Sequence, residues 1–267
     1  MPTRRAIPTT GKILCDMSWI LQLFKAIDHF DVEFRKAVVP ASRAEITKFA
    51  ELVEQPLPQD YCDFLAFMGD FESGLFWKEL VHTNLSSLVG HCSRLKASGV
   101  DFKSARCVPM AIGLDFDGFG LDLAEEQAHP PIVSLRGIRP VRLAFPSLPA
   151  MAFSHAFLYE QGATGREVKV TSVSDSKARE QVEQRLAARG YVTESFSSNR
   201  KRFLRKASAL FTLVIYPTGF VDIYFGSLQI EGFDQAHSDL EASIGRFEYA
   251  WNKTATLPEV RALLREE

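Results

Sequence analysis

One acidic run has the residue types, and nearly the spacing, of a calcium-binding loop. Asp115 and Asp117 would occupy loop positions 1 and 3, and Glu126 the bidentate position 12. Phe119 stands at position 5, where calcium needs an oxygen ligand, and no helical pattern flanks the run. We therefore interpret the run as a hairpin turn at Asp117-Gly118 with solvated carboxylates, and we expect neither a metal nor a cofactor.

A basic run further along the chain offers a different chemistry. From Arg200 to Lys206, five of seven residues are basic and Phe203 stands among them. Cations interleaved with an aromatic residue can follow a phosphate backbone. The run also fits a strand whose cations protect a sheet edge from aggregation. We favour the edge strand, and we expect no nucleic-acid partner.

The motifs of common catalytic sites are missing from the sequence. No G-x-S-x-G, H-E-x-x-H, phosphate-binding loop or G-x-G-x-x-G occurs. Ser154 and His155 are adjacent, so their side chains diverge instead of forming a catalytic pair. We expect a protein that is not an enzyme. Carboxylates on separate strands leave no spacing signature, so an unrecognised hydrolase is one alternative.

Length and composition are those of a globular protein with one large or two modest domains. The chain has 267 residues, 46% of them hydrophobic and 24% charged. No run approaches the roughly 18 apolar residues of a membrane span, and Asp16 interrupts the apolar run behind Arg4 and Arg5. Scattered cysteines without C-x-x-C spacing are typical of reduced thiols: Cys15, Cys62, Cys92 and Cys107. We expect a cytoplasmic protein without a membrane partner.

Charge is unevenly distributed along the chain. The net charge is −2, but residues 41–126 carry 14 acidic and 7 basic side chains, a balance of −7. Residues 161–267 carry 14 acidic and 15 basic side chains, a balance of +1. The acidic first half argues against nucleic-acid binding there and suits a partner with a basic surface.

Helical spacing dominates the beginning of the chain. Ser42 and Glu45 have capping-box spacing ahead of an apolar stripe, and Pro56-Leu57-Pro58 ends that stripe because proline donates no backbone hydrogen bond. Gly99 has the position of a helix C-cap. The patterns predict four helices, over residues 16–30, 42–54, 58–68 and 85–97. Short strands are expected after them, over residues 108–113, 119–123 and 132–135.

The order of these elements resembles the SMI1/KNR4 family, also called the SUKH superfamily, over about residues 41–160. The first resembling motif is an amphipathic helix followed by Leu57-Pro58, Asp60-Tyr61 and Phe64-Leu65. The second motif lies among the expected strands, at Pro109, Ala111, Asp117, Gly118, Leu121, Asp122 and Val133. The chain departs from the family at Met68-Gly69-Asp70, where the family commonly has Asn-Gly-Gly. The resemblance implies helices on a curved, mainly antiparallel sheet, closed by a short helix within residues 145–159.

The remaining residues predict a second, smaller α+β unit. We expect a first domain over residues 1–160 with an extra N-terminal helix, a linker at Gly162–Gly165, and a second domain over residues 166–267. Its expected strands cover residues 168–171, 191–198, 202–206, 210–216 and 220–226. Its expected helices cover residues 176–189, a stripe from Leu240 to Trp251, and residues 257–267.

The resemblance also implies a function, because bacterial members of this family are mostly immunity proteins. We expect an immunity protein that binds and neutralises a cognate polymorphic or secretion-system toxin by occluding its active site. A nuclease is one candidate for that toxin. A regulatory interaction scaffold of the same fold is the other alternative, and we expect a monomer or weak dimer. The expected toxin-binding residues are acidic or aromatic: Asp70, Phe71, Glu72, Trp77, Asp115, Asp117, Asp122, Glu125 and Glu126.

Overall fold

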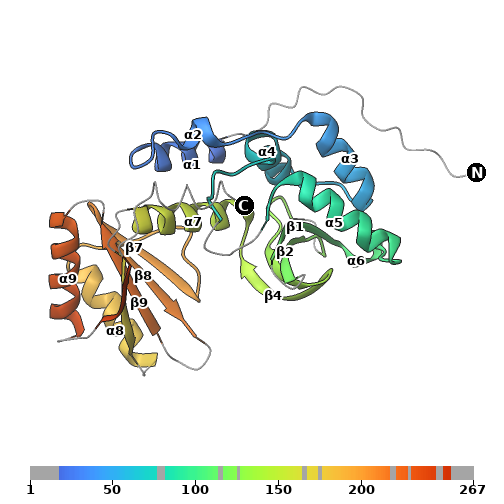
Figure 1. Ribbon diagram of the computed structural model, residues 1–267. Helices are drawn as coiled ribbons and strands as arrows, with labels where there is room; N and C mark the ends of the chain where they lie inside the picture. The colour runs from blue at the N-terminus through green and yellow to red at the C-terminus, as the bar shows by residue number, and fades with distance from the viewer. Residues whose placement is uncertain are drawn as a thin grey trace, which may run out of the picture.

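The computed structural model describes residues 18–76, 82–113, 117–124, 127–163, 167–173, 176–216, 221–227, 230–244 and 249–253. Within these ranges the chain forms two antiparallel sheets and nine helices, which confirms the expected α+β class. The first sheet has four strands in the order β1-β2-β3-β4, and the second has six in the order β10-β5-β9-β8-β7-β6. Figure 1 shows the two sheets with the long helix α7 between them.

Four of the first six helices form where the sequence predicts helices, and the two four-residue helices were not expected. They are α1 (Ser18–Asp28), α2 (Phe34–Ala37), α3 (Arg43–Val53), α4 (Gln59–Met68), α5 (Leu85–Ala97) and α6 (Phe102–Ala105). The capping box is present, because the Ser42 backbone N–H donates to Glu45 Oε2 at 2.8 Å and the Glu45 N–H donates to Ser42 Oγ at 3.2 Å. Gly99 has a φ of +87°, as its C-cap position requires. None of the helices in the described ranges is long and apolar enough to cross a bilayer.

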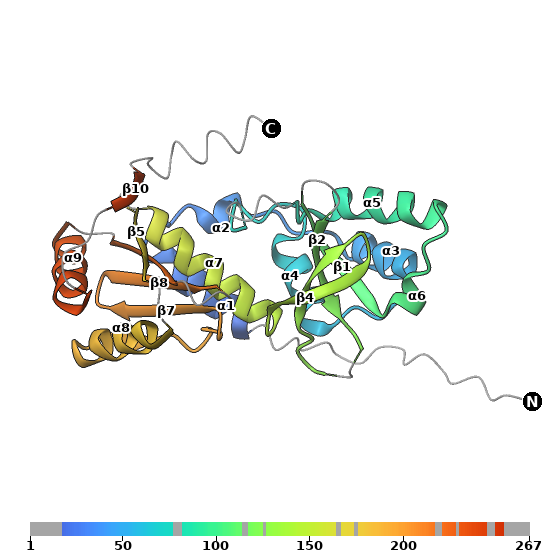
Figure 2. The ribbon, with the colours of Figure 1, turned by 90° about the horizontal axis from the view of Figure 1, so that it is seen from below.

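The four-stranded sheet consists of β1 (Cys107–Ile112), β2 (Asp117–Asp122), β3 (Ile132–Arg136) and β4 (Arg139–Phe145). Helices α3, α4 and α5 share one hydrophobic core with one face of this sheet, through residues such as Phe49, Phe64, Leu88, Met110 and Ile132. The other face holds a small separate cluster of Cys107, Val133 and Leu135. Both views show the helices gathered on one side of the strands (Figure 2).

The expected hairpin turn at Asp117-Gly118 is wrong. Both residues belong to β2, where Gly118 pairs with Ile112 of β1 and Leu135 of β3. A Cβ atom at Gly118 would lie 2.2 Å from the backbone oxygen of Ala111. Glycine is therefore needed there because two strands approach closely, and not because a turn requires positive φ.

Strand β4 is an element that the sequence did not reveal. Its residues from Arg139 to Leu143 are exposed, so they lack the alternation of buried and solvated positions that marks a half-buried strand. Val141 and Leu143 are 60% and 57% exposed. Pro140, which has no N–H to donate, fits a strand at the edge of a sheet.

Helix α7 (Leu148–Ala163) is longer than the predicted short helix and connects the two sheets. It continues through Gly162 and Ala163, so the expected linker is wrong at these two residues. One side of α7 packs against α1 and the first core, where Met151 and Tyr159 are buried. Phe157 packs instead with Phe203 of the second sheet.

The second sheet is covered on both faces. It consists of β5 (Glu167–Val173), β6 (Val192–Thr193), β7 (Lys201–Lys206), β8 (Ala209–Ile215), β9 (Val221–Ser227) and β10 (Tyr249–Lys253), with helices α8 (Ser176–Ala188) and α9 (Ile230–Ile244). Leu204 and Phe211 face the core shared with α8 and α9, whereas their neighbours Phe203 and Leu210 face α7. This alternation follows from the period of two along each strand.

Three predictions for this half need correction. The strand expected over residues 191–198 is limited to Val192–Thr193, because the chain turns at Ser195 and Phe196. The basic run forms β7, which is the second strand from the edge, since β6 pairs with it. The helix expected to reach Trp251 ends at Ile244, and Trp251 lies in β10. The terminal helix over residues 257–267 lies outside the described residues.

Candidate functional site

The structure places only part of the expected toxin-binding surface. Trp77, Asp115, Glu125 and Glu126 lie outside the described residues. Asp117 is placed as a backbone position in β2, without a description of its side chain. The remaining expected residues are Asp70, Phe71, Glu72 and Asp122.

The segment after α4 is held against the chain that precedes α3. The Asp70 side chain is exposed, and the Phe71 backbone oxygen accepts a hydrogen bond of 2.8 Å from the Val39 N–H. Glu72 is half-buried, and desolvation raises the pKa of its carboxyl above the ordinary value. Asp70 is therefore the fully solvated acid of this segment, and Glu72 contributes less negative charge than the sequence suggests.

The fold brings Glu72 toward one end of β2 and leaves Asp122 at the other end. His82 interacts electrostatically with Glu72 and forms an isolated β-bridge with Ile112 of β1. Ile112 pairs in turn with Gly118, the residue next to Asp117. Asp122 is five residues further along β2, about 17 Å away at strand spacing. Its Oδ1 accepts a hydrogen bond of 2.9 Å from the Ala124 N–H. Asp122 thus lies apart from the other expected contact residues.

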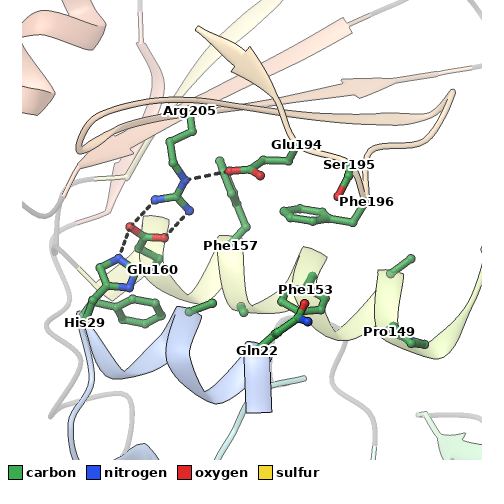
Figure 3. Close-up of a pocket in the computed structure, with 14 residues that line it drawn as sticks. Gln22, His29, Pro149, Phe153, Phe157, Glu160, Glu194, Ser195, Phe196 and Arg205 are labelled. Atoms are coloured by element: carbon green, nitrogen blue, oxygen red, sulfur yellow. Dashed lines mark hydrogen bonds and ion pairs between the residues drawn. The ribbon is translucent and has the colours of Figure 1, made fainter. Parts of the chain in front are cut away.

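A pocket lies at the junction of α1, α7 and the second sheet (Figure 3). This pocket has a volume of about 590 Å³. Its apolar wall is aromatic: Phe153 and Phe196 stack with centroids 6.0 Å apart, and Phe157 meets Phe196 edge-on at 6.2 Å. Its size and apolar lining are those of a site that accepts a small molecule or a protruding side chain.

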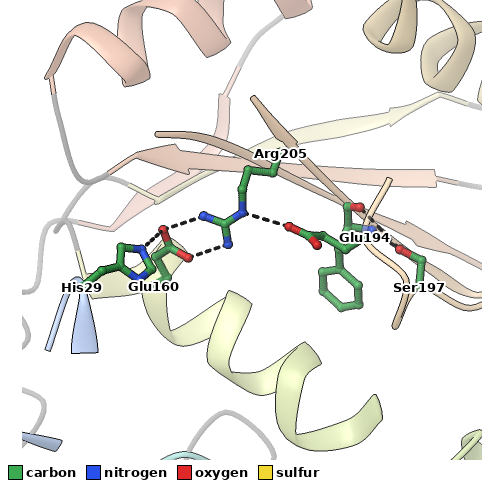
Figure 4. Close-up of polar contacts among 6 residues, drawn as sticks. His29, Glu160, Glu194, Ser197 and Arg205 are labelled. Atoms are coloured by element: carbon green, nitrogen blue, oxygen red, sulfur yellow. Dashed lines mark hydrogen bonds and ion pairs between the residues drawn. The ribbon is translucent and has the colours of Figure 1, made fainter. Parts of the chain in front are cut away.

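One end of the pocket is closed by a network of four ionisable side chains (Figure 4). The Arg205 Nη1 and Nη2 atoms donate to the two oxygens of Glu160, at 2.8 Å and 2.7 Å, and its Nε donates to Glu194 at 2.8 Å. His29 Nε2 lies 2.9 Å from the Glu160 Oε1. Burial acts to lower the pKa of Arg205, but the bonds to Glu160 and Glu194 outweigh it, so that the pKa is raised. Arg205 is therefore a permanent cation between two carboxylates.

This arrangement is suited to holding the fold together and to recognition. Glu160 is 2% exposed, and the bidentate contact with Arg205 compensates the burial of its carboxylate. The Arg205 guanidinium carbon also lies 5.2 Å from the centroid of Phe157. The Ser195 hydroxyl and the His29 imidazole lie at opposite ends of the pocket (Figure 3).

Sequence reasoning missed this pocket because its residues come from distant segments. His29 and Glu160 are separated by 131 positions, and Glu160 and Arg205 by 45. One local signal was available: Phe153, Phe157 and Glu160 recur at helical spacing on one face of α7. That spacing identifies a helix face but does not say what packs against it.

Comparison with known proteins adds no relative. No family model matches the chain, and no curated protein matches its sequence. The resemblance to the SMI1/KNR4 family stays an expectation that depends on the motifs quoted above.

Proposed function

We propose that this protein binds and neutralises a cognate polypeptide toxin, in the manner of SMI1/KNR4-type immunity proteins, and that it catalyses no reaction. The observation that carries the proposal is the order of elements in residues 43–145. Helix α3 begins at a capping box, and a Leu-Pro break, α4, α5 and an antiparallel sheet follow it. The helices share one hydrophobic core with the sheet. This is the order that the family resemblance implies.

The chemistry of the pocket at the junction of α1, α7 and the second sheet supports binding over catalysis. Arg205, Glu160, Glu194 and His29 are already engaged with one another. A general base or nucleophile needs a side chain that is free to exchange a proton with a substrate.

The surface proposed for the toxin is the acidic segment around Asp70, together with the Asp117 end of β2. Negative charge there would speed encounter with a basic toxin surface and exclude wrong partners. A stable complex needs about 800 Å² per partner, so neighbouring exposed residues of α3 and α4 would belong to it as well. Buried thiols such as those of Cys92 and Cys107 suit an encounter in the reducing cytoplasm.

Growth rescue tests the proposal directly. A host that expresses the product of the reading frame adjacent to this gene is expected to stop growing, and co-expression of this protein to restore growth. Asp70→Lys is expected to slow association about tenfold in a binding assay with the purified toxin. Glu180→Lys, which changes an exposed acid on α8 of the second half, is the matched charge control. The proposal would be refuted if this protein did not restore growth and formed no complex with the product of the adjacent reading frame.

A further inference from the structure

The large pocket, at the junction of α1, α7 and the second sheet, has a preformed aromatic wall. Phe196 lies in the turn between β6 and β7, and Ser197 fixes this turn because its Oγ accepts a hydrogen bond of 3.0 Å from the Phe203 N–H. The Glu194 N–H donates to the Phe203 backbone oxygen at 2.8 Å. The rings of Phe196 and Phe203 are in contact, with centroids 5.3 Å apart. The sheet itself therefore holds the wall in place, so a ligand would not have to order it.

Small side chains on two helices leave room for a ligand in front of this wall. Ala26 of α1 and Ala150 and Ala156 of α7 line the pocket with no more than a methyl group each. The resulting volume of about 590 Å³ lies within the range of pockets that enclose a small organic molecule, about 300–1,000 Å³. A single amino-acid side chain would leave much of this space unfilled. The dimensions therefore favour a free small molecule over one anchoring side chain of a partner protein.

The ion network gives one end of the pocket an excess of negative charge. Two carboxylates, Glu160 and Glu194, surround the guanidinium of Arg205, which uses three of its five N–H donors on them. His29 lies beyond Glu160, at the end of the network away from Glu194 (Figure 4). An anionic ligand would meet both carboxylates on its way to the two remaining donors of Arg205 and would be repelled by them. A cationic ligand would instead neutralise the excess charge.

Glu194 offers a specific contact for such a cation. Its Oε1 accepts from Arg205 Nε at 2.8 Å, whereas no hydrogen bond or ion pair within the described part of the chain engages its Oε2. Glu194 lies between Arg205 and Phe196 (Figure 3). A carboxylate oxygen beside an aromatic ring suits an ammonium group, because the oxygen accepts a charge-assisted hydrogen bond and the ring face attracts the cation. The polar end of the pocket is therefore suited to an ammonium group, and the aromatic wall to an apolar ring.

We propose that the large pocket binds a small organic cation, an amine carried on a flat apolar ring system. The ring system packs against Phe153 and Phe196, and the ammonium group donates to Glu194 Oε2. Binding of this cation is independent of the proposed toxin binding, which uses the acidic segment around Asp70.

Isothermal titration calorimetry with the full chain and three probes of one carbon skeleton tests this proposal. Naphthylethylamine carries the ammonium group, naphthylethanol is its neutral counterpart and naphthylacetate is its anionic counterpart. The amine is expected to bind at least about tenfold more tightly than the acetate, with the alcohol in between. Binding of the amine should also have a negative heat-capacity change, which marks burial of its apolar ring.

Two variants separate the charge of the pocket from its aromatic wall. Glu194→Gln keeps a side-chain oxygen for Arg205 Nε but removes the negative charge, so the affinity for the amine should fall about tenfold and that for the alcohol less than about twofold. Phe196→Ala should weaken the binding of both probes, because it removes ring surface. Glu183→Gln is the matched control and should change amine affinity less than about twofold. Glu183 also pairs with an arginine, Arg202, and its side chain is 23% exposed against 27% for Glu194, but it does not line the pocket.

Circular dichroism and melting temperature verify that each variant is folded. The proposal would be overturned by absence of amine binding at millimolar concentration, by equal affinities for the amine and the acetate, or by an equal loss of amine affinity in Glu183→Gln. If the amine does not bind but a peptide containing arginine and tryptophan does, and Glu194→Gln abolishes that binding, the pocket accepts a side chain of a partner polypeptide instead of a small molecule.

Discussion

Replacing Arg205 by methionine is the sharpest perturbation of the ion network at the end of the large pocket. Methionine keeps most of the length and apolar stem of arginine but removes its charge and its three donors to Glu160 and Glu194. The carboxylate of Glu160 would stay buried, with only His29 within hydrogen-bonding distance. The variant therefore tests what the arginine contributes to stability.

The expected loss follows from burial and geometry. Breaking a buried ion pair by removing one partner costs about 3–5 kcal/mol. The Arg205 side chain is itself 31% exposed and His29 stays 2.9 Å from Glu160, so solvent and imidazole recover part of the loss. We expect the free energy of unfolding to fall by about 3 kcal/mol at neutral pH.

Urea unfolding followed by circular dichroism measures this loss, within a double-mutant cycle. Combining Arg205→Met with Glu160→Gln removes the stranded charge, so the double variant is expected to be about 1–2 kcal/mol more stable than Arg205→Met alone. Arg94→Met, at an exposed position, is the control.

A loss below about 1 kcal/mol for Arg205→Met would contradict this reasoning, because it would class the network with surface ion pairs. Additive effects of Arg205→Met and Glu160→Gln would also contradict it, since groups in contact should couple. An equal loss for Arg94→Met would show that removing any arginine destabilises the chain.

Three further outcomes are expected from the first half of the chain. Gly118→Ala should lower the free energy of unfolding by more than about 2 kcal/mol in urea titration, because its Cβ would lie 2.2 Å from the backbone oxygen of Ala111. Ser42→Ala should lower the melting temperature through a loss of about 1 kcal/mol, because the Glu45 N–H loses its acceptor. Burial raises the pKa of Glu72, so its contribution to stability is fully present below the unfolded pKa near 4.5 and is lost as pH rises through the folded value. Glu72→Gln should therefore flatten the decline in stability between acidic and neutral pH.

The outcomes at Gly118 and Glu72 each have a control or a contrary result. Gly90 in α5 has open space around it, with no atom nearer than 4.0 Å, so Gly90→Ala should be neutral or stabilising where Gly118→Ala is not. Similar effects of both substitutions would contradict the close-approach argument. If the stability of Glu72→Gln still declines steeply between acidic and neutral pH, another group causes that decline.

Local signals predicted the helices of the first half well. The capping box at Ser42 and the proline break after α3 act within a few residues, so the sequence contains their whole cause. Strand β4 escaped prediction because its residues face outward at an edge and show no alternation. The turn assigned to Asp117-Gly118 failed because a glycine needed for close approach of two strands looks the same in sequence as a glycine needed for a turn.

The candidate sites could be predicted far less well than the helices. The residues of the large pocket come from segments that only the tertiary fold brings together. Charge in the basic run was visible in the sequence. Which of its cations would be neutralised was not, because Glu160, Glu183 and Asp239 approach it from helices far along the chain.

One turn at the end of α7 has a consequence for how the protein can bind another molecule. Tyr159 donates to Asp31 at 3.0 Å, Glu160 holds Arg205, and Gln161 accepts from Thr212 at 2.9 Å. These side chains tie the N-terminal helices and the second sheet to the same helical turn without a flexible tether. A ligand that contacts the acidic segment and the large pocket at the same time would lose its translational and rotational freedom only once. Two weak contacts would then combine into tight binding by avidity.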